Sequence, residues 1–160
     1  MTQLDFSTIL PYTILTAWAC VLLLVDLFIP KNRKGITALL AALGLALTLG
    51  FTLMQIGTEL VGFNNMVVLD GFSTFVNALL LVSGLLGVAL AYGYVKRVGI
   101  ERGEYYTLLL FSVTGMMLMA QATDLIIVFL ALELLSIPLY VLAAFALPKT
   151  ESEEAGMKYF

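Results

Sequence analysis

Histidine is missing from this sequence, cysteine occurs once, and charged residues make up only 12% of the 160 residues. The lack of histidine removes the most common haem and metal ligand, and the side chain that most often exchanges protons near pH 7. The single cysteine, Cys20, excludes an internal disulfide framework and a cysteine-built iron–sulfur site. No metal or cofactor site is therefore predicted in this chain, and any proton chemistry would use carboxylates and lysines.

The scarcity of charge also indicates a membrane protein. Soluble domains are about a quarter charged, whereas this chain is 61% hydrophobic with a mean hydropathy of +1.03. It has no basic patch with interleaved aromatic residues, so nucleic acid is not an expected partner. No Lys or Arg precedes Lys31 and the first apolar run is too long for a signal peptide, which predicts a first membrane span.

Five segments are long enough to cross a lipid bilayer as helices, which takes about 20 apolar residues each. The fold predicted for residues 1–160 is all-α, a single polytopic membrane helical bundle without the alternating pattern of a barrel. A polar stretch then leads into what resembles a truncated sixth helix from about residue 153, and we expect the sequence to be an N-terminal piece of a longer protein. The five spans are 8–29, 36–57, 70–95, 105–122 and 124–147.

All the basic residues fall on one set of connections, after the first, third and fifth spans. The opposite connections, around 58–69 and 122–124, contain none. The positive-inside rule therefore predicts an outer N-terminus and a multi-pass topology. The basic residues are Lys31, Arg33, Lys34, Lys96, Arg97, Arg102, Lys149 and Lys158.

Glu133 is the only formal charge in the apolar run from Leu125 to Ala146. A charge at mid-bilayer costs about 2.5–3.5 kcal/mol on insertion scales, so it is tolerated only with a partner, a water path or a proton. Ser136 and Tyr140 follow at helical spacing on the same face, and Pro138 frees the carbonyl of Leu134 next to Glu133. These residues predict a proton- or ion-handling site, and the alternative is a Glu133 locked in a static pair.

Three other charged residues can also be explained without a functional role. From the residues alone Glu104 is expected to be a solvated carboxylate in a first helical turn, where the helix dipole favours it, with a functional site as the alternative. Lys158 is explained either by an i,i+4 pair with Glu154 or by entry into apolar surroundings. Asp26 is expected to bond to its loop, with a functional site as the alternative.

Local features of the helices can also be assigned. Asp70, Thr123 and Asp124 are expected to cap helices. Small residues within the spans are expected to allow close helix packing, and these are Gly44, Gly84, Gly87 and Gly115.

The stretch GEYYTLLLFSVTGMMLMAQATDLIIVFLALELLSIPLYVLAAF, residues 103–145, resembles subunit N of proton-translocating NADH-quinone oxidoreductase, respiratory complex I. The tail EEAGMKYF at 153–160 is similar to the start of the sixth helix in that family, and the first three spans agree in number and orientation. The motifs GMMLMA, DLI and ELLSIPLYVL carry most of the resemblance. The glutamate is shared with the wider antiporter-like group.

The resemblance implies roles for individual residues. Glu133 matches a buried glutamate whose charge is tuned by a lysine on a later helix, Lys158 matches the lysine of the sixth helix, and Glu104 matches an acidic residue at the start of the fourth. It further implies an antiporter-like subunit of the bacterial inner (plasma) membrane, with other membrane subunits and protons as partners. NADH and quinone would be used by other subunits. The alternatives are a subunit of a multisubunit cation/proton antiporter and a purely structural membrane subunit.

Overall fold

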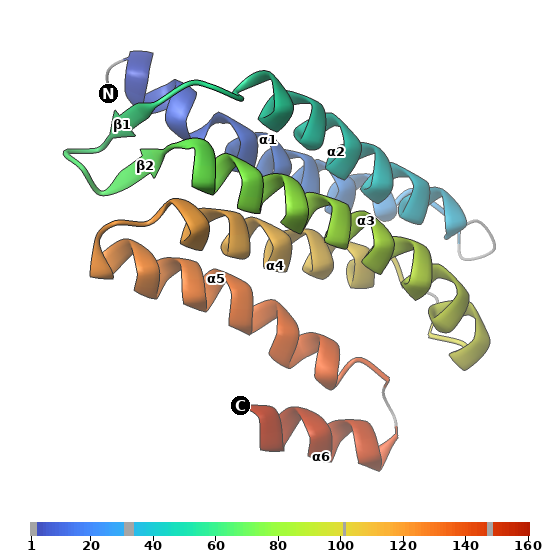
Figure 1. Ribbon diagram of the computed structural model, residues 1–160. Coiled ribbons are helices and arrows are strands. Elements are labelled where there is room, and N and C mark those ends of the chain that lie inside the picture. The colour runs from blue at the N-terminus through green and yellow to red at the C-terminus, as the bar shows by residue number, and fades with distance from the viewer. Residues whose placement is uncertain (1–2, 31–33, 101, 147–148) are drawn as a thin grey trace.

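The computed structural model describes residues 3–30, 34–100, 102–146 and 149–160. Over these residues the chain forms six helices and one two-stranded hairpin (Figure 1). In chain order the elements are α1 (Gln3–Asp26), α2 (Gly35–Met54), β1 (Leu60–Gly62), β2 (Val67–Leu69), α3 (Gly71–Val98), α4 (Glu104–Gln121), α5 (Leu125–Ala143) and α6 (Thr150–Tyr159).

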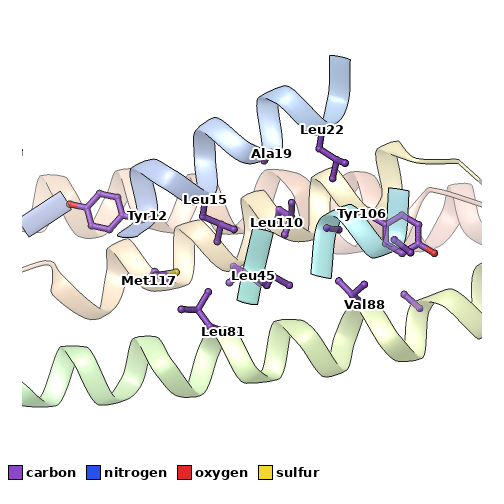
Figure 2. Packing of buried hydrophobic residues seen from close by; sticks show 14 residues of the cluster. Tyr12, Leu15, Ala19, Leu22, Leu45, Leu81, Val88, Tyr106, Leu110 and Met117 are labelled. Atoms are coloured by element: carbon purple, nitrogen blue, oxygen red, sulfur yellow. The ribbon is translucent and has the colours of Figure 1, made fainter. Parts of the chain in front are cut away.

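Helices α1 to α4 form a bundle in which α4 contacts α1, α2 and α3. Helix α5 lies along α4, and the short α6 contacts α5 on the side away from the bundle (Figure 1). Apolar side chains from all four bundle helices meet at its centre, where they are fully buried (Figure 2). These side chains are Leu15, Leu45, Leu81, Leu110 and Met117.

Four of the helices are long and apolar enough to cross a membrane: α1, counted from Phe6, α2, α3 and α5. Helix α4 occupies the predicted range 105–122, but it is not apolar enough to be counted among these four helices. Nine of the 18 residues of α4 are buried by neighbouring helices, and several of these nine are polar. Because these side chains do not face lipid, α4 contains fewer apolar residues. By contrast, only 11% of the apolar window of α5 is buried. The all-α membrane bundle is thus supported in general form, with four apolar spans.

The connection between α2 and α3, expected to be a loop, contains the antiparallel hairpin β1–β2, so the all-α prediction was incomplete. Its turn uses positive φ angles at Phe63, Asn64 and Asn65, and asparagine tolerates this conformation better than most residues. The Asn-Asn pair between two apolar runs was the sequence signal for this turn.

Both strands of the hairpin contact the bundle: β1 lies on α1, and β2 contacts α1, α3 and α4. Val67 and Leu69 are buried, and Val67 pairs with Ala122 at the end of α4. The Thr123 hydroxyl donates to the Asn65 carbonyl, so Thr123 joins the hairpin instead of capping α5. The hairpin therefore covers the end of the bundle opposite the basic connections (Figure 1).

The caps predicted from aspartates are confirmed. Asp70 accepts from the backbone N–H of Ser73 at 2.7 Å, and the Ser73 hydroxyl accepts from the backbone of Asp70, which forms a capping box at the start of α3. Asp124 accepts from the Ile126 backbone at 2.8 Å and caps α5. Each cap satisfies backbone donors that a helix start leaves free.

Candidate functional site

The candidate site centres on Glu133, near the middle of α5. The helix forms because its sequence is a continuous apolar run with an aspartate cap in front, and it continues through Pro138. Glu133 is the only residue with a formal charge within the bounds of α5, and its side chain is half-buried. Among the residues that the structure describes, none forms a hydrogen bond or ion pair with its carboxylate.

The position of α4 decides which way Glu133 faces. Gly115 of α4 lies directly on the α5 backbone: a Cβ at this position would be 2.5 Å from the Leu135 nitrogen and 2.9 Å from the Ala131 oxygen. Ala131 and Pro138, seven residues apart and so on one face, are the buried residues of α5. Glu133 is two residues from Ala131, about 200° around the helix. Its side chain therefore lies on the face turned away from α4.

Ser136 and Tyr140 share that outer face, as the helical spacing predicted, but they do not form a hydrogen-bonded chain to Glu133. The Ser136 hydroxyl donates to the Leu132 carbonyl of its own helix at 2.6 Å. The Tyr140 ring makes edge contacts with Tyr159 and Phe160, both with centroids 5.4 Å apart. The polar stripe is thus covered at Tyr140 by the end of α6, and Glu133 lies beyond that cover.

Pro138 is buried against α4 and lies on the opposite face from the stripe. A proline has no N–H to donate to the carbonyl four residues earlier, which belongs to Leu134. The helix turn between Leu134 and Pro138 is therefore the one with a missing backbone bond, and it is the turn next to Glu133. Gly115 packs against that same turn.

Lys158 and Glu104 are not brought to Glu133. The Lys158 ammonium lies 3.1 Å from a Glu154 carboxylate oxygen, with both side chains largely exposed at 78% and 69%. Gly156, two residues earlier, is the buried α6 residue and faces Ala144 of α5, so Lys158 points away from α5. Glu104 is exposed in the first turn of α4. Lys158 therefore forms the exposed i,i+4 pair with Glu154, and Glu104 is a solvated carboxylate in a first helical turn.

Asp26 has a more buried environment than the sequence indicated. Its carboxylate lies 2.6 Å from the Lys34 ammonium and accepts from the Thr37 hydroxyl at 2.6 Å, with the two charged side chains only 7% and 13% exposed. Gly103, just before α4, leaves no room for a side chain next to this carboxylate. The expected bond between Asp26 and its loop is present, and it also joins α1 to α2 beside the start of α4. Spacing could not reveal this, because the helix-to-helix distance is set by packing.

Close packing was expected at four glycines, and the structure distinguishes them. Gly115 meets the backbone of α5, Gly44 meets the Trp18 ring, and Gly84 meets Val113 at 3.1 Å, whereas Gly87 has only ordinary contact with Leu109 at 3.7 Å. Within the described residues, no group of three or more His, Cys, Asp or Glu side chains is placed to hold a metal ion.

Residues 122–160, which contain α5 and α6, match the family model described as "NADH:quinone oxidoreductase/Mrp antiporter, TM". Over 157 residues the chain is 46% identical to NADH-quinone oxidoreductase subunit N 2 of Roseiflexus castenholzii, covering 97% of this chain and 31% of that protein. It is 44% identical over 156 residues to subunit N of Chloroflexus aggregans, covering 97% and 32%.

A solved structure agrees with these relatives. A chain of respiratory complex I from Thermus thermophilus with bound aureothin matches with a TM-score of 0.76 and 31% identity, over 94% of this chain and 32% of that one. The resemblance to subunit N is therefore confirmed along nearly the whole chain. The chain spans about a third of the length of the relatives that it matches.

Proposed function

We propose that this chain is part of subunit N of a proton-translocating NADH-quinone oxidoreductase, and that Glu133 takes part in moving protons. The observation that carries the proposal is the Glu133 carboxylate, half-buried in an apolar helix on the face turned away from α4. An acid within a membrane span needs a partner, water or a proton. Among the described residues Glu133 has no partner, so the groups that complete its site belong to another helix or another subunit.

We also propose that the chain works within a larger membrane assembly. Other membrane subunits and the lipid bilayer of the bacterial inner (plasma) membrane are its partners, and NADH oxidation and quinone reduction take place in other subunits. Bacterial relatives named as subunit N support this assignment.

For the topology, we infer that α4 is a fifth span and that the N-terminus lies outside. Helix α4 has 18 residues and lies alongside the four apolar spans, which explains why it reaches across with fewer apolar residues. The described basic residues of the connections lie at the end of the bundle opposite the hairpin. They are Lys34 before α2, Lys96 and Arg97 at the end of α3, Arg102 before α4 and Lys149 before α6. The positive-inside rule then puts the hairpin on the outer side.

Lys158 and Glu104 are proposed as further members of the proton route, as the resemblance implies. The support for Lys158 is that α6 begins at the basic end and runs back along the outer face of α5, where its aromatic end covers Tyr140 (Figure 1). This places α6 on the side of α5 that carries the polar stripe. For Glu104 the support is its position beside the buried Asp26–Lys34 pair, one residue after Gly103.

The test is Glu133→Gln in the full-length subunit within the assembled complex. The substitution keeps size and removes the titratable proton, so we expect fewer protons moved per NADH oxidised, with assembly intact. Glu133→Asp should recover part of the pumping because it restores a carboxylate. The matched control is Glu153→Gln, which removes an exposed carboxylate on α6 and should leave pumping unchanged. Normal pumping in Glu133→Gln would contradict the role.

A second candidate function has its own support, because the matching family model names both the oxidoreductase and the Mrp antiporter. In a cation/proton antiporter, Glu133→Gln would abolish sodium-dependent proton exchange, and no NADH-dependent activity would accompany the protein. If Glu133→Gln instead prevents assembly, its role is structural. These three results separate the candidate functions.

A further inference from the structure

Buried polar side chains gather at the hairpin end of the α1–α4 bundle. Tyr12 of α1, Asn77 of α3 and Gln121 of α4 are 8%, 0% and 2% exposed. Each lies in a helix that also contributes apolar residues to the core, such as Leu15, Leu81 and Met117. Three separate helices thus contribute one large polar side chain to the same end of the core.

Each of the three side chains lies one turn from a buried core residue of its own helix, on the side toward the hairpin. Asn77 comes one turn before Leu81 and Gln121 one turn after Met117, so each shares the inward face of its apolar neighbour. Figure 2 shows Leu81, Met117 and Leu15 around the same part of the core, with the Tyr12 ring beyond Leu15 toward the N-terminal end of α1. Tyr12, Asn77 and Gln121 form the next layer outward, which we call the polar layer.

The polar atoms of this layer have no hydrogen-bond partner among the described residues. They are the Tyr12 hydroxyl and both amide atoms of Asn77 and of Gln121, together with the Thr74 hydroxyl one turn before Asn77. Buried polar groups in native proteins are almost always bonded, either to protein or to ordered water. Lipid cannot supply that bond within a membrane span. Several such groups side by side require a ligand that can both donate and accept.

The hairpin separates the polar layer from the surface. Strand β2 contacts α1, α3 and α4, the three helices that supply the layer, and its Val67 and Leu69 side chains are buried. Val67 pairs with Ala122, the residue directly after Gln121. The neighbouring Gln55 donates to the Ser7 carbonyl at 2.8 Å and closes the α1–α2 side. The layer is therefore enclosed by β2 on the outside and by apolar core on the inside.

We propose that the polar layer is a binding site for internal water molecules, which bridge the Asn77 and Gln121 amides and the Tyr12 hydroxyl beneath the hairpin. Each amide offers two donors and an acceptor oxygen, which suits water. The three side chains that define the layer carry no formal charge at neutral pH, which favours a neutral ligand over a cation. The site is distinct from the Glu133 stripe, because that stripe lies on the face of α5 turned away from α4.

Hydroxyl-radical footprinting with mass spectrometry tests this in the intact membrane assembly that contains the chain. Radicals formed from internal water oxidise adjacent side chains that bulk solvent cannot reach, so Tyr12 and Met117 should be oxidised despite their burial. The control is Tyr106, which is also buried, at 2% exposure, but lies at the other end of the bundle. We expect several-fold more oxidation of Tyr12 than of Tyr106. Equal protection of the two tyrosines would overturn the proposal.

A second measurement is independent of any variant's folding. Cryo-electron microscopy of the unmodified assembly, at a resolution that shows ordered water, should reveal density within hydrogen-bonding distance of the Asn77 and Gln121 amides. The proposal fails if the two amides bond directly to each other, or to a side chain from elsewhere in the assembly, with no water between them.

Amino-acid substitutions test whether the side chains of the polar layer hold the water. Asn77→Leu removes the amide at similar volume and should reduce Tyr12 oxidation several-fold. Ser83→Ala, an exposed position on the same helix, is the matched control and should leave it unchanged. If Asn77→Leu is assembled and Tyr12 oxidation is unaltered, Asn77 does not hold the water and the proposed site is wrong.

Discussion

Replacing Gly115 by alanine tests the contact that turns Glu133 away from the bundle. The added Cβ would lie 2.5 Å from the Leu135 nitrogen and 2.9 Å from both the Ala131 oxygen and the Leu134 carbonyl carbon, where ordinary contacts are 3.4–4 Å. All three atoms belong to the α5 backbone and cannot rotate aside. Helix α5 would have to move away from α4 by roughly 1 Å to restore ordinary contact distances.

The size of the effect follows from two opposing terms. Overpacking of this kind costs about 1–3 kcal/mol, whereas alanine in place of glycine inside a helix recovers about 1 kcal/mol. Gly87→Ala separates the two terms, because a Cβ there would make ordinary contact with Leu109 at 3.7 Å. We therefore expect Gly115→Ala to be less stable to unfolding than Gly87→Ala by about 1–3 kcal/mol.

The assay is denaturant unfolding of both variants in detergent micelles, followed by helical circular dichroism. A second measurement is proton transfer by both variants in reconstituted membranes. Gly115 packs on the turn next to Glu133, so a shift of α5 would change the surroundings of the Glu133 carboxylate. Equal unfolding free energies for the two alanine variants would refute the reasoning, because the α4–α5 approach would then not be limited by Gly115.

Two further predictions concern charged groups. Lys34→Met leaves the buried Asp26 carboxylate uncompensated and should lower the unfolding free energy by about 3–5 kcal/mol, whereas Lys158→Met removes an exposed pair and should change it by less than about 1 kcal/mol; similar losses in the two variants would contradict the burial of the first pair. At Asp70, the hydrogen bond from the Ser73 backbone N–H holds the carboxyl pKa below its ordinary value. The lowered pKa makes the stabilisation by this cap fully present above the ordinary aspartate pKa, and it is lost as the pH falls through the lowered one. Asp70→Ala should cost about 0.5–2 kcal/mol at neutral pH and less in acid, as measured by unfolding across pH, and a cost that rises toward acid would contradict it.

The sequence alone determined the features that depend on neighbours along the chain. Apolar runs of spanning length predicted the helices, because a bilayer requires each backbone group to be satisfied within its own segment. Asp70 and Asp124 predicted caps because a capping side chain bonds only two or three residues ahead. The isolation of Glu133 and its stripe with Ser136 and Tyr140 also followed, since helical periodicity places these residues on one face.

The tertiary structure alone decided what those faces meet. The sequence of a helix does not specify which of its faces contacts a neighbouring helix. The close contact of Gly115 with the α5 backbone showed that the stripe of Glu133, Ser136 and Tyr140 faces away from α4. The burial of Asp26 with Lys34, and the gathering of Tyr12, Asn77 and Gln121 under the hairpin, likewise required the packing of helices distant in sequence. Periodicity along a single helix carries no information about such contacts, because they depend on the distance and rotation between helices.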